Sequence, residues 1–245
     1  MFEFLKKKKQ AKTFAPLSTD IHCHLLPGVD DGSSNINETI SCLKTLYEVG
    51  FDKIYITPHF QAHYPNEEGD IEKRFEELMT KIASSGADGI PEIAGISGEY
   101  RFDADFERKP GESRILPLPG NKLLCELSLH KSDYMPTETW KKYIELGYTL
   151  ILAHPERYPY LNIHSPFVEE IKTMGVLFQV NILSLNGFYG ESAKRKGMEY
   201  IENGMSEYLG TDTHNIRYAK ALADTANNNE VKELLKKHVF LNSQL

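Results

Sequence analysis

Two short motifs place metal-binding side chains at alternate positions of predicted strands. His22 and His24 close the predicted strand 17–24, and Asp212 and His214 repeat the same spacing near the other end of the chain. Side chains two residues apart on a strand point to the same side, so each pair can bind one ion. A single pair is weak evidence, because ordinary polar residues give the same pattern. Imidazole and carboxylate without thiolate suit Mn, Fe or Zn in a catalytic site with open positions.

Further candidate ligands also lie at or just past the carboxyl ends of predicted strands. They are His59, Glu99, Glu126 and His154. In a parallel barrel these strand ends converge on one face, so residues far apart in the sequence meet in one cleft. The sequence therefore predicts a common site for metal ions.

Seven strand-like segments alternate with helical patterns along the chain. The predicted strands are 17–24, 53–59, 92–96, 122–127, 149–154, 176–183 and 208–212. The predicted helices are 38–49, 70–82 (with Asp70 as N-cap), 137–146, 166–174, 191–203 and 230–238. This order predicts a parallel sheet with helices outside it, either a barrel or a doubly wound fold. The long connections 60–69 and 100–121 follow strands, where a barrel carries its functional loops.

The composition indicates one globular domain. The chain has 245 residues, of which 40% are hydrophobic and 26% are charged, as expected of a single α/β barrel. No apolar run approaches the ~20 residues of a membrane span, and the first five residues are too short for a signal-peptide core. Three cysteines without C-x-x-C spacing favour reduced thiols, so we expect a cytoplasmic protein.

Charge is distributed unevenly between the N-terminus and the remainder of the chain. Residues 1–12 hold five of the 28 basic residues and one of the 35 acidic ones, so the remainder is more acidic than the net charge of −7 indicates. Such a surface repels polyanions, and we expect no nucleic-acid partner. We interpret residues 1–15 as a flexible basic tail, capable of at most weak peripheral contact with an anionic membrane, and 16–245 as the folded domain.

Five motifs together resemble the polymerase and histidinol phosphatase (PHP) superfamily. They are DIHCHLLPGVDDG (20–32), TPH (57–59), GEY (98–100), HPER (154–157) and GTDTH (210–214). The sequence is most similar to a bacterial branch of manganese-dependent protein-tyrosine phosphatases from capsule and exopolysaccharide loci. The resemblance implies a single-domain, distorted (β/α)7 TIM-like barrel with three divalent metal ions, of which manganese is the first choice and iron or zinc the alternatives.

The resemblance also implies a division of the ligands among three ions. The first ion would have His22, His24, Glu126 and Asp212. The second would share Glu126 and add Glu99 and His154. The third would have Asp31, His59 and His214. Asp30 is adjacent to Asp31 and could exchange roles with it.

Two arginines are candidates for binding the phosphoryl group. Arg157 lies in the HPER motif and Arg217 follows His214 by three residues; guanidinium offers a bidentate fork to phosphate oxygens, although a structural ion pair is the alternative role for each. The implied reaction is in-line attack by metal-bound hydroxide on a phosphoester. None of the three cysteines has an arginine six residues later, so the C-x5-R loop of cysteine-based phosphatases is absent.

Substrate identity comes from the resemblance alone. It implies phosphotyrosine on the tail of a membrane-bound bacterial tyrosine kinase that regulates capsular or exopolysaccharide synthesis. A small-molecule phosphatase of the histidinol phosphatase type would use the same metals, and a metal-stabilised binding module without catalysis is the alternative from another class. Tyr64, Tyr100, Phe102 and Tyr158 lie in or beside the predicted loops, but aromatic residues also form cores, so the sequence assigns none to the substrate.

Overall fold

The computed structural model describes residues 12–102, 114–130 and 137–245. Most of the predicted N-terminal tail, residues 1–11, lies outside this range. The last part of the predicted tail is not flexible, which corrects the expectation. Phe14 is fully buried, and its ring stacks on Phe51 at 5.7 Å between centroids. The backbone N–H of Phe14 also donates to the carbonyl of Val49 at 2.9 Å. The folded domain therefore begins before residue 16, since burial of an aromatic ring fixes this segment.

Nine short strands form the wall of a barrel. They are β1 (Thr19–Asp20), β2 (Lys53–Ile56), β3 (His59–Phe60), β4 (Glu92–Ile96), β5 (Glu99–Arg101), β6 (Lys122–Glu126), β7 (Thr149–Ala153), β8 (Leu177–Asn181) and β9 (Tyr208–Gly210). One sheet has the order β1-β2-β4 and the other β3-β5-β6-β7-β8-β9, and these strands pair in parallel throughout. Only two residues separate β2 from β3 and β4 from β5, so the strands occupy seven positions in the β/α order.

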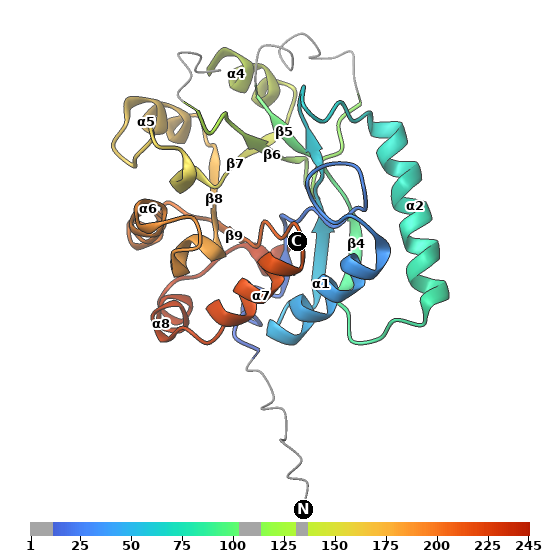
Figure 1. The fold of residues 1–245 in the computed structure, drawn as a ribbon. Coiled ribbons are helices and arrows are strands. Elements are labelled where there is room, and N and C mark those ends of the chain that lie inside the picture. The colour runs from blue at the N-terminus through green and yellow to red at the C-terminus, as the bar shows by residue number, and fades with distance from the viewer. Residues whose placement is uncertain (1–11, 103–113, 131–136) are drawn as a thin grey trace, which may run out of the picture.

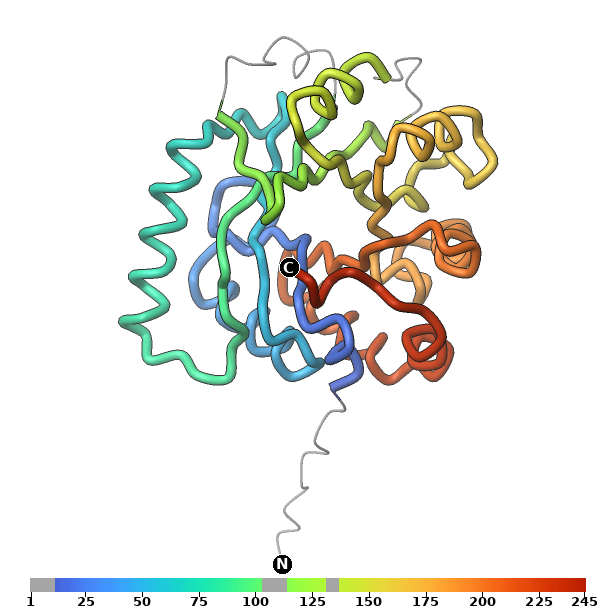
Figure 2. The backbone as a smooth tube through the Cα atoms, turned by 180° about the vertical axis from the view of Figure 1, so that it is seen from behind, coloured from blue at the N-terminus to red at the C-terminus, as the bar shows by residue number. Residues whose placement is uncertain are grey.

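The first and last strand positions meet and close the barrel. Cys23 and Thr213 form a parallel bridge, and the backbone N–H of Asp212 donates to the carbonyl of His22 at 2.8 Å. The expected distorted (β/α)7 single-domain barrel is thus confirmed. The last residues of the chain run across the amino ends of the strands, as the view from behind shows (Figure 2). There, Lys53 Nζ donates to the Leu245 carbonyl oxygen at 3.2 Å.

Helices surround the strands, as Figure 1 shows. They are α1 (Ile36–Val49), α2 (Glu68–Ser85), α4 (Thr137–Glu145), α5 (Pro166–Thr173), α6 (Glu191–Glu202), α7 (Ile216–Thr225) and α8 (Asn229–Lys237), with the 3₁₀ turns η1 (Pro155–Arg157), η2 (Ile182–Asn186) and η3 (Asn242–Gln244). The sequence pattern did not predict α7, whose buried residues are Ala219, Leu222 and Thr225. The N-cap of α2 is Glu67 and not the predicted Asp70. Asp70 lies in the first turn of the helix, where its carboxylate interacts favourably with the helix dipole.

Strand alternation divides the core into two layers. Leu123 of β6 and Leu150 of β7 belong to the larger cluster, which also contains helix residues such as Trp140. Their strand neighbours Leu124 and Ile151 belong to a smaller cluster. Because successive side chains of a strand point to opposite faces, the smaller cluster fills the barrel interior. It forms an apolar floor beneath the polar residues at the strand ends.

Candidate metal centre

The structure brings the nine predicted metal ligands together at the carboxyl ends of the strands. His22 and His24 follow β1, His59 begins β3, and Glu99 begins β5. The remaining ligands come from the ends of β6, β7 and β9 and from the loop before α1; they are Glu126, His154, Asp212, His214 and Asp31. These residues form four overlapping groups whose candidate donor atoms lie within 4.8 Å of one another: His24, Asp31, His59 and His214; His22, His24 and Asp212; His22, Glu99 and His154; and His59, Glu99 and Glu126.

Glu99 lies at the centre of this cluster. Its Oε1 is 3.2 Å from Nε2 of His22 and 3.0 Å from Nε2 of His154. Its Oε2 is 3.4 Å from Nε2 of His24 and 2.9 Å from Nδ1 of His59. The carboxylate of Glu99 is thus in contact with four imidazoles.

In the division of ligands that the resemblance implies, Glu126 is the bridge, whereas in the structure Glu99 contacts more of the imidazoles. Strand register provides the physical reason, since Glu99 pairs with His59 and Leu124, whereas Glu126 pairs with Arg101. Glu126 therefore lies one pleat nearer the mouth, and its Oε1 is 3.3 Å from Nδ1 of His59. Motifs show which residues reach the face but not how deeply each one lies.

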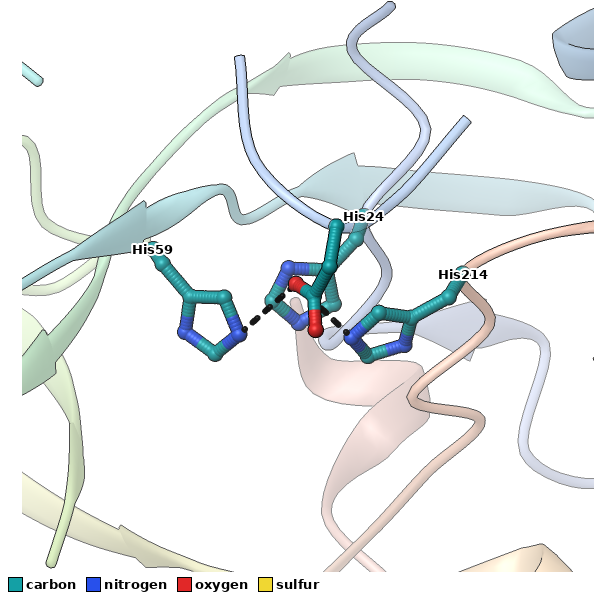
Figure 3. A group of neighbouring side chains, drawn as sticks. His24, His59 and His214 are labelled. Carbon is teal, nitrogen blue, oxygen red and sulfur yellow. Dashed lines mark ion pairs between the residues drawn. The ribbon is translucent and has the colours of Figure 1, made fainter. Parts of the chain in front are cut away.

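The unpaired atoms of the cluster fit divalent cations. Nδ1 of His59 and Oε2 of Glu99 are only 2.9 Å apart, yet both are buried and neither has a hydrogen-bond partner among the described residues. Donor atoms about 2.1 Å from one ion lie roughly 3.0–3.4 Å from each other, a spacing close to that seen throughout this cluster. Figure 3 shows the rings of His24, His59 and His214 converging on one carboxylate.

The charges of the cluster stabilise one another. Burial alone would raise the pKa of the Glu99 carboxyl, but the His22 and His59 rings outweigh burial and hold that pKa well below its ordinary value. Burial alone would lower the pKa of His59, yet Glu99 and Asp31 raise it strongly. Without metal, the raised pKa of His59 favours a proton on that ring, and a bound cation would displace it.

Side chains behind the ligands hold the imidazole rings in place. Nδ1 of His22 lies 2.6 Å from Oε1 of Gln179, and Nδ1 of His24 lies 3.0 Å from Oδ2 of Asp30. Such partners fix ring orientation and tautomer in metal sites. The sequence analysis missed Gln179, which lies mid-strand in β8 outside every motif and has no signal apart from being polar in an apolar run.

The structure separates the roles of Asp30 and Asp31. Asp30 is buried, and besides contacting His24 it accepts hydrogen bonds from the backbone N–H groups of His59 and Gly32 at 3.0 and 2.9 Å. The Asp31 side chain is 52% exposed, and its Oδ1 lies 3.4 Å from Nε2 of His59 and 3.5 Å from Nε2 of His214. Asp30 therefore orients the site, while Asp31 faces the space in which an ion would bind.

Two of the candidate ligands have a strained backbone. His154 has φ of 37° and Asp212 has φ of 51°, in the left-handed region that non-glycine residues rarely adopt. Each such residue costs roughly 1–3 kcal/mol and persists only where its surroundings enforce it. The backbone N–H of His154 is held by the carbonyl of Gln179 at 2.7 Å. Both side chains belong to the ligand groups described above.

A cleft of about 280 Å³ opens over the cluster. Its lining is polar and aromatic: Asp31, His59, Gln61, His63, Tyr64, Arg101, Glu126, Leu129, His154, Arg157, Asp212, His214 and Tyr218. Three of the aromatic residues that lie in or beside the predicted loops are buried in the core: Tyr100, Phe102 and Tyr158. Of the four aromatics singled out from the sequence, only Tyr64 lines the cleft.

The two candidate arginines differ in position. Arg157 lines the cleft, where its Nη1 donates to Oδ2 of Asp212 at 2.7 Å and its guanidinium stacks 4.3 Å above the Tyr189 ring. Arg217 is exposed on the first turn of α7, 5.2 Å from the Phe188 ring, and does not line the cleft. Arg101, which the sequence analysis passed over, does line it.

Comparison with known proteins identifies the family. A model of the capsular polysaccharide synthesis family CpsB/CapC matches residues 18–238. The chain belongs to this family. Among its relatives, tyrosine-protein phosphatase YwqE of Bacillus subtilis (strain 168) is 25% identical over 203 residues, 81% of this chain and 78% of YwqE. Tyrosine-protein phosphatase CpsB of Streptococcus pneumoniae is 28% identical over 204 residues, 80% of this chain and 83% of CpsB.

A solved structure shares the fold of the whole chain. It comes from crystal structures of YwqE from Bacillus subtilis and CpsB from Streptococcus pneumoniae, described as metal-dependent tyrosine phosphatases. The TM-score is 0.77 at 21% identity, covering 92% of this chain and 94% of the other. In the described part of this family member, no helix combines the length and apolarity needed to cross a bilayer.

Proposed function

We propose that this member of the CpsB/CapC family is a metal-dependent protein-tyrosine phosphatase. Its curated relatives carry that activity in their names. The observation that carries the proposal is the buried donor cluster around Glu99, which opens directly into a cleft containing arginine and tyrosine. In it, Oε2 of Glu99 and Nδ1 of His59 have no hydrogen-bond partner among the described residues. Divalent ions in this cluster would activate water and neutralise charge on a phosphoryl group.

The ligand residues are proposed to hold three ions, with manganese as the first choice. Glu99 would join the lower two groups, which contain His22, His24, His154 and Asp212. The group nearest the solvent contains His24, Asp31, His59 and His214, with Glu126 beside it. Nitrogen and oxygen donors of this kind also accept iron or zinc, so metal supply would influence which ion is bound.

Arg157 is proposed to bind the phosphoryl oxygens. Its contact with Asp212 and the face of Tyr189 fixes the guanidinium plane at the edge of the cluster. Burial alone would lower the pKa of Arg157, but Asp212 raises it, so the group stays charged. The nitrogens that do not face Asp212 remain available as charge-assisted donors to phosphate. Arg217 is retained as a second candidate that would act from the mouth of the site.

Two tyrosines in the cleft favour an aryl ester over an alkyl ester. The ring of Tyr64 is nearly parallel to that of His59, with 5.6 Å between centroids and 11° between planes. The ring of Tyr218 packs on His214 at 5.0 Å. Aromatic walls next to candidate metal ligands could hold a phenyl ring by offset stacking while its phosphate reaches the ions.

The proposed physiological substrate is phosphotyrosine on the tail of a membrane-bound bacterial tyrosine kinase that regulates capsular or exopolysaccharide synthesis, in the cytoplasm. The family description supports the link to capsular polysaccharide synthesis, and the named relatives support phosphotyrosine as the substrate group. A disordered tail is a suitable substrate, because an extended segment can place one side chain in a cleft of this size.

A substrate comparison on metal-loaded protein tests the proposal. Manganese-loaded protein is assayed with a phosphotyrosine peptide, the matching phosphoserine peptide and histidinol phosphate, and bound metal is counted by elemental analysis. We expect kcat/KM to be highest for phosphotyrosine. A more than tenfold preference for histidinol phosphate would instead support a small-molecule phosphatase. Binding of the peptide without turnover would support a non-catalytic module.

A further inference from the structure

Arg101 lies at the mouth of the cleft, directly above the central glutamate. Arg101 and Glu99 are two residues apart on β5, so their side chains leave the strand on the same side. Parallel pairing places Arg101 level with Glu126 of β6, one pleat nearer the solvent than Glu99. The side chain is 26% exposed and lines the cleft, so it is accessible to a bound substrate.

The guanidinium of Arg101 has only part of its donor capacity in use. Its Nε contacts Oε1 of Glu126 at 3.3 Å. Within the described parts of the chain, this is the only hydrogen bond or ion pair that Arg101 makes. The two terminal nitrogens, which carry four N–H groups, therefore have no partner among residues 12–102, 114–130 and 137–245. A half-buried, permanently charged group with unused donors is suited to binding an anion.

The environment of Arg101 parallels that of Arg157. Each guanidinium contacts a carboxylate of the cluster, Glu126 for Arg101 and Asp212 for Arg157. Glu126 and Asp212 belong to different ligand groups, so the two arginines lie beside different parts of the cluster. Arg101 is the last residue of β5, which lies two positions from β7, the strand that precedes Arg157, and both arginines line the same cleft.

We propose that Arg101 is a second phosphate-binding arginine, so that the phosphoryl group is held between Arg101 and Arg157 while it faces the ions. This inference deepens the proposed function and rests on it for the reaction, although not for anion binding. Arg101 would donate from its terminal nitrogens to phosphoryl oxygens and keep its Nε contact with Glu126. The competing role is purely structural, in which Arg101 only supports Glu126 as a ligand.

Phosphate binding at known metal content distinguishes these roles. Wild-type protein, Arg101→Met, Arg101→Lys and the control Arg114→Met are loaded with manganese, and the bound ions are counted by elemental analysis. Arg114 is a matched control because it pairs with Glu72 on the surface and its side chain is 69% exposed. Inorganic phosphate binding is measured by calorimetry, and KM and kcat are measured with p-nitrophenyl phosphate.

At equal manganese content, we expect Arg101→Met to bind inorganic phosphate at least about tenfold more weakly, as loss of a charge-assisted contact predicts. Arg101→Lys should lie between Arg101→Met and wild type, because it keeps the charge but loses the fork, and Arg114→Met should match wild type. Wild-type phosphate affinity in Arg101→Lys and Arg101→Met at equal manganese content would overturn the inference. If wild type binds phosphate through Arg101 but does not hydrolyse aryl phosphates, the proposed function fails and this inference stands.

Discussion

Two pairs of buried carboxylates respond to burial in opposite ways. Glu99 and Asp212 lie in the ligand cluster, and Asp20 and Glu156 lie beneath and beside it; all four are at most 3% exposed. Burial raises the pKa of Asp20 to about 6 and that of Glu156 to about 7. The pKa values of Glu99 and Asp212 instead fall well below their ordinary values, because neighbouring imidazoles outweigh burial.

The difference comes from the charge of the neighbours and not from depth. Asp20 accepts hydrogen bonds from neutral groups, including the Thr211 hydroxyl at 2.6 Å. Glu156 accepts from the Ser184 hydroxyl at 2.6 Å and from the backbone N–H of Asn181 at 3.0 Å. Neutral donors only partly replace water around an ionised carboxylate, whereas cations stabilise it directly. Glu99 and Asp212 are thus suited to binding cations, whereas Asp20 and Glu156 are suited to connecting loops behind the site.

The largest expected effect is that of Glu99→Gln. Removing the charge of the central carboxylate should lower kcat/KM on p-nitrophenyl phosphate by more than the ~100-fold seen for outer partners of metal ligands. Manganese content should fall with it. Glu156→Gln, equally buried, is the matched control and should keep its manganese. Equal losses in both variants would show that burial alone makes these glutamates essential.

A smaller loss is expected when Asp30 or Gln179 is altered. Asp30→Asn and Gln179→Ala leave every candidate ligand in place but loosen the rings of His24 and His22. Manganese affinity should fall about 10–100-fold, as is typical for such partners. Competition titration with a chromogenic chelator measures this change. Affinity equal to that of wild type in both variants would show that the rings are fixed by packing alone.

Manganese binding should be coupled to proton release. The pKa values of His22, His24 and His59 are raised in the metal-free protein, with Glu99 or Asp212 among the causes. The raised pKa values favour protonated rings in the metal-free protein, and a bound cation displaces such protons, so affinity should rise with pH. Calorimetric titration in buffers of different ionisation enthalpy gives the number of protons released. A value of zero would contradict the proposed charge balance.

The smallest effect concerns stability and involves Glu156. Its folded pKa of about 7 exceeds the ordinary value of 4.5, so the folded state binds more protons than the unfolded state between these values. The free energy of unfolding should therefore decrease as pH rises through this window, by up to about 3 kcal/mol. Glu156→Gln should remove this decrease, as measured by urea unfolding at pH 5 and pH 8. An unchanged slope would mean that Glu156 is not the responsible group.

The sequence predicted the parts of the site that depend on alternation and strand order. Two-residue spacing placed His22 with His24 on one side of a strand, and repeated β/α order predicted a parallel sheet with helices outside it, which the motif resemblance narrowed to a barrel. Depth was not accessible, because the register between β5 and β6 decides whether Glu99 or Glu126 is central. The sequence did not identify Gln179 and Arg101, because their roles depend on neighbours from other strands, and a local sequence pattern does not show those neighbours.

The exposure of Asp31 has a consequence for exchange of ions with the surroundings. Its side chain is 52% exposed, whereas those of His59 and His214 are 10% exposed and Glu99 is fully buried. An ion held by Asp31 would have one bond that water can replace without opening the fold. We expect this outermost ion to exchange fastest and to be lost first on dialysis. In a purified sample, the outermost ion would then be the metal supplied by the last buffer, while the inner ions would still be those bound in the cell.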